Sequence, residues 1–141
     1  MPAGRLFLID TSALARVQHP PVHRLLAGLL ADRAAATCVT VDLEVGYSGR
    51  GLREVRSLAA VRREQYVVLP VDEHIAERAR ETLVLLAAAG RHRAAGIVDL
   101  LTAAVAEAHG AVLLHYDTDF EHIAAVTGQP QAWIVPPGSV S

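Results

Sequence analysis

Short apolar runs alternate along this chain with longer segments in which apolar residues recur every three or four positions. The runs predict strands at residues 5–10, 37–40, 66–69, 111–114 and 132–135. The intervening segments predict a first helix that begins near Ser12. They predict six more helices, over residues 22–33, 41–47, 52–64, 73–89, 97–109 and 119–126. Because no short hairpin turn joins two of the runs, we expect a parallel sheet with helices on both faces.

The 141 residues, 52% of them hydrophobic, are enough for one domain with a buried core. We expect a single domain over residues 1–141, with a loose tail at 136–141. Neither a membrane span nor a signal peptide is expected, because no apolar stretch has the length or flanking pattern for either. The single cysteine, Cys38, excludes an internal disulfide, argues against a zinc–thiolate site and fits a cytoplasmic protein.

All 13 basic residues of the chain are arginine. A P-loop needs its lysine to reach phosphate groups, and receiver domains and haloacid-dehalogenase phosphatases also place a lysine beside their aspartates. The missing lysine therefore argues against three common α/β classes. The formal net charge of −2 does not by itself indicate a nucleic-acid or membrane partner.

Acidic residues follow or flank the apolar runs at separated places, namely Asp10, Glu44, Asp99, Asp117 and Asp119. The carboxyl ends of parallel strands share one edge of a sheet, where ligands bind, and these positions permit the acids to converge there. Two carboxylates roughly 4 Å apart repel each other by about 4 kcal/mol at an effective dielectric of about 20. A hard divalent cation such as Mg²⁺ removes that conflict. Three hydroxyls are candidates to orient its water ligands: Thr11, Ser12 and Thr118.

Four segments occur in the order and spacing of one known family: LIDTSAL at 8–14, LEVGYS at 43–48, IVDLLTAAVA at 97–106 and LLHYDTDFEHIA at 113–124. With them the chain resembles PIN domains over nearly its whole length, and it looks most like bacterial VapC-type toxins. The resemblance implies a three-layer α/β/α fold with a central parallel sheet. It also implies an Mg²⁺-dependent ribonuclease, with Mn²⁺ able to substitute, that forms a homodimer. A cognate VapB-type antitoxin is implied as well, with a basic or aromatic segment that enters the acidic cleft.

Position by position, the resemblance assigns the family's acidic quartet to Asp10, Glu44, Asp99 and Asp117. Asp119 matches a further acid that the family uses less uniformly, and Thr11, or Ser12 beside it, matches the hydroxyl of the first segment. The implied reaction is hydrolysis of RNA by a metal-activated water, with one or two metals. The implied role is that of a toxin that inhibits translation or growth.

Each acid also has a purely structural interpretation. Asp10 suits a cap of the turn after a strand, and Asp99 suits the first turn of a helix, where the helix dipole favours an acid. Asp119 suits the N-cap of the last helix. Asp42 competes with Glu44, because both lie near the start of the same expected helix.

Two basic segments are candidates to bind RNA phosphates. Arg91 and Arg93 lie in a loop before Asp99, and Arg50 and Arg53 begin an arginine-rich segment. That segment contains Arg50, Arg53, Arg56, Arg62 and Arg63, and a solvated face paired with nearby acids is its competing interpretation.

Two rival functions stay open beside the ribonuclease. One is another acidic metallonuclease or phosphatase, such as a Toprim-like domain, although that pattern places Glu where this chain has Asp10. The other is a catalytically silent PIN domain that binds RNA or protein.

Overall fold

The computed structural model describes residues 4–141; of the domain expected over 1–141, the first three positions lie outside the described part. The strands are β1 (Phe7–Ile9), β2 (Ala35–Thr37), β3 (Val67–Val68), β4 (Val112–His115) and β5 (Gln131–Trp133). The helices are α1 (Thr11–Leu14), α2 (Pro20–Ala31), α3 (Val39–Tyr47), α4 (Leu52–Gln65), α5 (Glu73–Ala88), α6 (Ile97–Ala108) and α7 (Asp119–Thr127). Strands and helices follow one another in the order that the sequence predicts.

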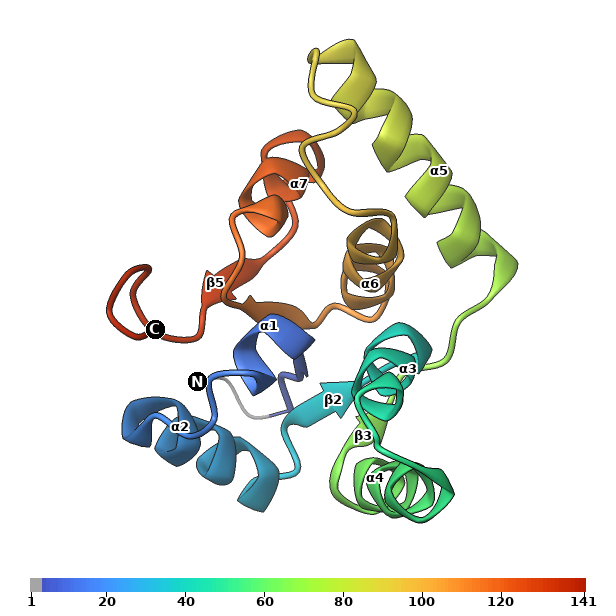
Figure 1. Cartoon of the computed structure of the whole chain (residues 1–141). Coiled ribbons are helices and arrows are strands. Elements are labelled where there is room, and N and C mark those ends of the chain that lie inside the picture. Colours follow the sequence, from blue (N-terminus) through green and yellow to red (C-terminus); the bar gives the residue numbers. More distant parts are fainter. Residues whose placement is uncertain (1–3) are drawn as a thin grey trace.

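The strands form one parallel sheet in the order β3-β2-β1-β4-β5. Leu8 of the central strand β1 lies opposite Ala36 of β2 and Leu113 of β4. Figure 1 shows α2 on one side of the sheet and α6 and α7 on the other, with α5 packed outside these two. The expected three-layer α/β/α fold is therefore confirmed. Within residues 4–141, no helix combines the length and the apolar character needed to cross a membrane.

Alternate residues of β1 face opposite sides of the sheet, as the pleat of a strand requires. Leu8 packs into the core formed with α3, α5, α6 and α7. Phe7 and Ile9 pack into a second core, together with Val22 and Leu26 of α2. Both faces of the strand are apolar, which is typical of parallel sheets covered on both sides.

The second strand lies earlier in the chain than the sequence predicts. The sequence predicts it over residues 37–40, but β2 covers Ala35–Thr37, and Cys38 is the buried N-cap residue of α3 rather than a strand residue. β-branched residues favour strands, yet Thr40 lies in the helix. Its hydroxyl is 2.6 Å from that of Thr102 on α6, so a contact between helices overrides the local preference.

A buried arginine that binds a half-buried aspartate fixes α3 and α4 to the sheet. Arg62 on α4, 5% exposed, donates from Nε to Asp42 Oδ1 and from Nη2 to Thr37 Oγ1, each at 2.7 Å. Thr37 donates its hydroxyl to Asp42 Oδ1 at 2.8 Å. The guanidinium also lies over the ring of Tyr66, 4.2 Å from its centroid. These contacts join β2, α3 and α4, and they set the position of Glu44 on α3.

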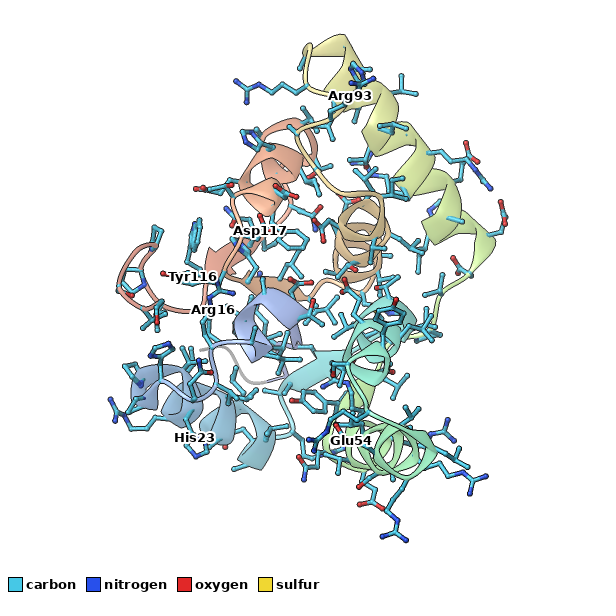
Figure 2. The ribbon with its side chains drawn as sticks, in the orientation of Figure 1. Arg16, His23, Glu54, Arg93, Tyr116 and Asp117 are labelled. Carbon is cyan, nitrogen blue, oxygen red and sulfur yellow. The ribbon has the colours of Figure 1, made fainter. Side chains whose placement is uncertain are left out.

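The C-terminal residues return to the end of β4. The hydroxyl of Tyr116 accepts hydrogen bonds from the amides of Gly138 and Val140, at 2.8 and 3.4 Å, and donates to the Val140 carbonyl at 2.9 Å. Figure 2 shows Arg16 beside Tyr116, and the guanidinium of Arg16 lies 4.4 Å from the centroid of the tyrosine ring. The tail that the sequence predicts to be loose thus contacts the residue that follows β4.

We expect Arg62→Met to lower the free energy of unfolding by about 2–4 kcal/mol, because it leaves Asp42 and Thr37 without their buried donor. Urea denaturation followed by circular dichroism measures this loss. Arg63→Met makes the same change at an exposed neighbouring position. It should lower the free energy of unfolding by less than about 0.5 kcal/mol. Equal effects of the two substitutions would show that the buried contact adds nothing to stability.

Candidate metal centre

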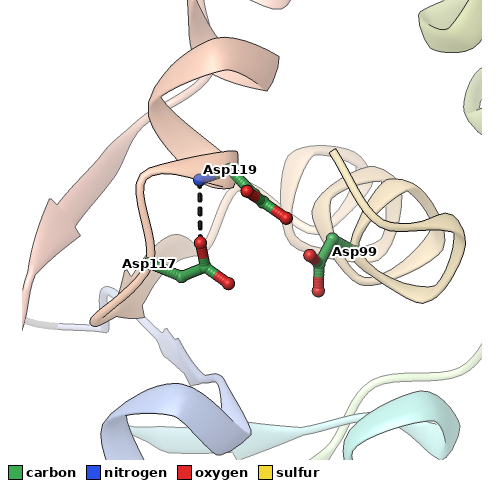
Figure 3. Close-up of side chains that lie close together, drawn as sticks. All are labelled: Asp99, Asp117 and Asp119. Carbon is green, nitrogen blue, oxygen red and sulfur yellow. Dashed lines mark hydrogen bonds between the residues drawn. The ribbon is translucent and has the colours of Figure 1, made fainter. Parts of the chain in front are cut away.

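Three aspartates converge beside the carboxyl edge of the sheet, and we call them the aspartate cluster. Asp99 lies in the first turn of α6, Asp117 follows β4, and Asp119 is the first residue of α7. One carboxylate oxygen from each lies within 4.8 Å of the others, and all three side chains are half-buried. Figure 3 shows the carboxylates of Asp117 and Asp119 directed toward Asp99.

Backbone amides hold two members of the cluster in place. The amide of Asp119 donates to Asp117 Oδ1 at 2.9 Å, and the amide of Gly96, the N-cap residue of α6, donates to Asp119 Oδ2 at 3.2 Å. The amide of Asp117 itself donates to Nδ1 of His115 at 3.2 Å. A Cβ at position 96 would lie 3.1 Å from Asp99 Oδ2. Glycine therefore allows the loop before α6 to close on the cluster.

Asp10 follows the central strand and is 3% exposed. Its Oδ2 accepts hydrogen bonds from the amide and the hydroxyl of Ser12, at 3.0 and 2.6 Å, so this oxygen does cap α1. The Ser12 hydroxyl also accepts the amide of Tyr116 at 2.9 Å, which ties the end of β1 to the end of β4. Oδ1 of Asp10 is buried without a hydrogen-bond partner anywhere in residues 4–141. A buried carboxylate oxygen left in this way is costly unless a cation binds it.

The acids at this edge act on one another electrostatically. The pKa of Asp99 is raised to about 8, first by burial, next by its hydrogen bond with Asp119, and then by the charges of Asp10, Asp117 and Asp119. Without a cation, the cluster therefore holds a proton at neutral pH. The effect of Asp10 on Asp99 places both acids in one electrostatic site.

The residues at this edge fit a hard divalent cation. Each donor is a carboxylate oxygen, and Mg²⁺ and Mn²⁺ prefer such ligands over the nitrogen and sulfur ligands that zinc sites favour. A cation bound by the cluster and Asp10 would give Asp10 Oδ1 a partner and would compete with the proton on Asp99.

Glu44 lies outside the group of three. On α3, its Oε1 accepts the hydroxyl of Thr11 at 2.9 Å. Its competitor Asp42 is bound by Arg62 and Thr37 and so has a structural role. The contacts favour Glu44 over Asp42 as the acid of α3 that is free to serve a site near β1.

The first residues of α7 test whether Asp119 is the N-cap residue of this helix. Thr118 is the N-cap residue and Asp119 is the first helical residue, so the interpretation of Asp119 as the cap is wrong. Thr118 is exposed and makes no side-chain capping bond. Of the three candidate hydroxyls, Thr11 and Ser12 contact acids, whereas that of Thr118 does not.

The loop between α5 and α6 carries two of the candidate phosphate ligands. Arg91 Nη1 lies 3.4 Å from Nδ1 of His122 on α7, and Arg93 is exposed. Figure 2 shows Arg93 near the end of α5, well away from Asp117. The same loop ends at Gly96, whose amide contacts Asp119 of the cluster.

The arginine-rich segment offers fewer free, exposed arginines than the sequence predicts. Arg50 makes an exposed ion pair with Glu54 at 3.1 Å, and Arg53 is exposed beside it. Arg62, expected in the same set, is buried against Asp42 and is excluded from contact with RNA.

Two residues that contact the cluster were not identified from the sequence. Gly96 occupies the N-cap position before α6, and His115 is the polar last residue of an otherwise apolar strand. Both signals are visible in the sequence, but neither reveals that the partner is an aspartate.

In the metal-free chain, Asp99→Asn should raise the melting temperature more at about pH 8 than at about pH 5. The unfolded carboxyl ionises near pH 4 and the folded one near pH 8. Between these values only the folded state holds the proton, so the stability of the natural chain falls as pH rises. Thermal melts in EDTA test this, with the exposed Asp32→Asn as the control. A difference between the two variants that does not widen with pH would contradict the raised pKa.

Gly96→Ala should weaken Mn²⁺ binding by about 10-fold, at the lower end of the usual cost of disturbing the groups around a metal ligand. Alanine suits the backbone angles at this position, φ −69° and ψ 154°, so the change acts through the methyl group beside Asp99 Oδ2. Isothermal titration calorimetry measures the affinity. Gly28→Ala, whose Cβ would meet nothing within 4 Å, is the control. If the two variants bind Mn²⁺ equally well, the close approach at Gly96 has no bearing on the site.

Comparisons with known proteins point to one family. The PIN domain family matches residues 7–126. Ribonuclease VapC21 of Mycobacterium tuberculosis (strain ATCC 25618 / H37Rv) is 41% identical over 133 residues, which cover 94% of this chain and 96% of the relative. Ribonuclease VapC51 of the same strain is 43% identical over 136 residues, which cover 95% and 96%.

Solved structures show the same fold. A VapBC-5 structure from Mycobacterium tuberculosis, a member of the VapBC family of toxin–antitoxin systems, matches with a TM-score of 0.62 and 26% identity, over 94% of this chain and 99% of that one. VapBC2 from Rickettsia felis, bound to a DNA fragment from its promoter, matches with a TM-score of 0.72 over 90% of this chain and 97% of that one. Its sequence identity is 17%, so this similarity shows the fold alone. The chain belongs to the PIN domain family.

Proposed function

We propose that this chain is a metal-dependent endoribonuclease that hydrolyses RNA phosphodiester bonds. One observation carries the proposal: Asp99, Asp117 and Asp119 converge within 4.8 Å beside buried Asp10, which has an unpaired oxygen. Such a group of carboxylates is suited to a divalent cation. The names of the relatives at 41% and 43% identity, VapC ribonucleases, support RNA as the substrate.

The proposed metal ligands are acids from four parts of the chain: Asp10, Glu44, Asp99, Asp117 and Asp119. Bound Mg²⁺, or Mn²⁺ in its place, lowers the pKa of a water and stabilises negative charge on a phosphodiester. The chain's own task is to hold the carboxylates in position. Ser12 fixes the Oδ2 atom of Asp10, and the Thr11 hydroxyl fixes Glu44.

We further propose that the chain is the toxin of a toxin–antitoxin pair, that it inhibits translation or growth, and that it acts in the cytoplasm as a homodimer. The solved VapBC-5 structure, described as part of a toxin–antitoxin system, supports a VapB-type antitoxin as the partner. RNA as the substrate supports the cytoplasm, and a single buried free cysteine is compatible with it.

We assign four exposed arginines outside the aspartate cluster to RNA phosphates. Arg91 and Arg93 lie in the loop that leads to Gly96 and the cluster, and a phosphate backbone that reaches the acids from this side would pass them. Arg50 and Arg53 are farther candidates, and Arg50 is partly neutralised by Glu54.

The purified chain should cut RNA into discrete fragments in the presence of Mg²⁺ or Mn²⁺ and not in EDTA. Asp99→Asn should slow this cleavage by more than about 100-fold, because removal of a ligand costs at least as much as removal of a group that supports one. Gel electrophoresis of total RNA measures the cleavage, and sequencing of the fragment ends identifies the target. Asp32→Asn, the same chemical change at an exposed position, should cleave like the natural chain.

Absence of metal-dependent cleavage, from a folded chain that is free of antitoxin and binds Mn²⁺, would contradict the ribonuclease and would favour a silent binding module. Cleavage that persists in Asp99→Asn would instead point to a contaminating nuclease.

A further inference from the structure

His115 is the last residue of β4, and its side chain is fully buried beside the aspartate cluster. Its ring packs against Phe120 and Trp133, with 5.1 Å between ring centroids in each pair. Both ring nitrogens have partners: Nδ1 lies 3.2 Å from the amide of Asp117, and Nε2 lies 2.5 Å from Oε1 of Gln131. The ring is therefore held in one orientation by two hydrogen bonds and two aromatic contacts.

The partners of the ring define where its proton lies. A backbone amide can only donate, so Nδ1 of His115 must accept the amide of Asp117 and carries no proton. The proton of the neutral ring then lies on Nε2, which donates it to the side-chain oxygen of Gln131. Burial lowers the pKa of His115, which agrees with a neutral ring.

We propose that His115 is a positioning residue for Asp117 and acts through the backbone amide of that aspartate. The inference rests on the proposed function, in which Asp117 is a metal ligand. The bond to His115 fixes the backbone of Asp117, and the amide of Asp119 fixes its Oδ1 atom at 2.9 Å. Two hydrogen bonds, one on the backbone and one on the carboxylate, thus set the direction of the side chain.

The competing interpretation is that His115 only fills the core between Phe120 and Trp133. In that case any substitution that removes the ring would lower stability, and the Mn²⁺ affinity of each variant would fall only as far as its stability falls. Two substitutions separate these interpretations, because each loses the ring but imitates a different nitrogen of it. Asparagine offers an acceptor near the place of Nδ1, whereas glutamine offers a donor near the place of Nε2.

The test compares His115→Asn with His115→Gln in the purified full chain, by Mn²⁺ titration and by thermal melts. His115→Gln should weaken Mn²⁺ binding by about 10-fold or more, as loss of a group that orients a ligand does. His115→Asn should weaken it by less than about 3-fold, because the Asp117 amide keeps an acceptor. Both should lower the melting temperature to a similar extent. His74→Gln, at an exposed histidine of α5 that makes no side-chain hydrogen bond within residues 4–141, should change neither quantity.

Each outcome decides between the interpretations. Equal losses of Mn²⁺ affinity in the two variants, or no loss in His115→Gln, would overturn the positioning role while leaving the proposed function intact. Failure of the natural chain itself to bind Mn²⁺ would instead overturn the proposed function and, with it, this inference.

A measurement on the natural chain covers the case in which the variants do not fold. Long-range ¹H–¹⁵N nuclear magnetic resonance reports the protonation of each imidazole nitrogen. We expect Nδ1 of His115 to be unprotonated and Nε2 to be protonated, both in EDTA and with Mg²⁺. A proton on Nδ1 in either condition would exclude the bond to Asp117 and overturn the inference.

Discussion

Mutual repulsion of the acids at the carboxyl edge of the sheet is the constraint that the rest of the structure has to overcome. Asp10, Asp99, Asp117 and Asp119 lie close enough that burial and their charges raise the pKa of Asp99 to about 8. One pair of carboxylates roughly 4 Å apart costs about 4 kcal/mol, while a whole domain is stable by about 5–15 kcal/mol. The two apolar cores on either side of the sheet therefore have to offset the mutual repulsion of these charges.

Asp10 and Asp117 are held by residues two positions away in the sequence, whereas the elements that carry the acids are joined by buried polar contacts. A hydroxyl pair at 2.6 Å, Thr40 with Thr102, links α3 to α6, and Arg62 links α3 to α4 and β2. The threonine pair thus sets Glu44 on α3 relative to Asp99 on α6, and Arg62 holds α3 itself in place. Such contacts are directional, so they fix the separation of the helices more closely than apolar packing alone.

Features with a local cause could be predicted from the sequence, and those that depend on a distant partner could not. Apolar runs and the acids that follow them are local, so the order of elements and the position of Asp10 after a strand could be predicted. The end of β2 was misplaced because the local preference of Thr40 gave way to a partner on α6. Arg62 was misassigned to the surface because its partner Asp42 lies 20 positions away. The contact of His115 with the cluster depends on a turn whose geometry no residue pattern specifies.

The charge of the site can be neutralised in three ways, and under the proposed function these ways exclude one another. A proton on Asp99 neutralises part of it in the metal-free chain, and a divalent cation would do so in the active form. A basic side chain of a bound partner would be the third. Each has to act on the same few oxygens, because one oxygen from each of Asp99, Asp117 and Asp119 lies within 4.8 Å of the others. A partner that inserts a positive charge would therefore inhibit by replacing the cation, without any change in the fold.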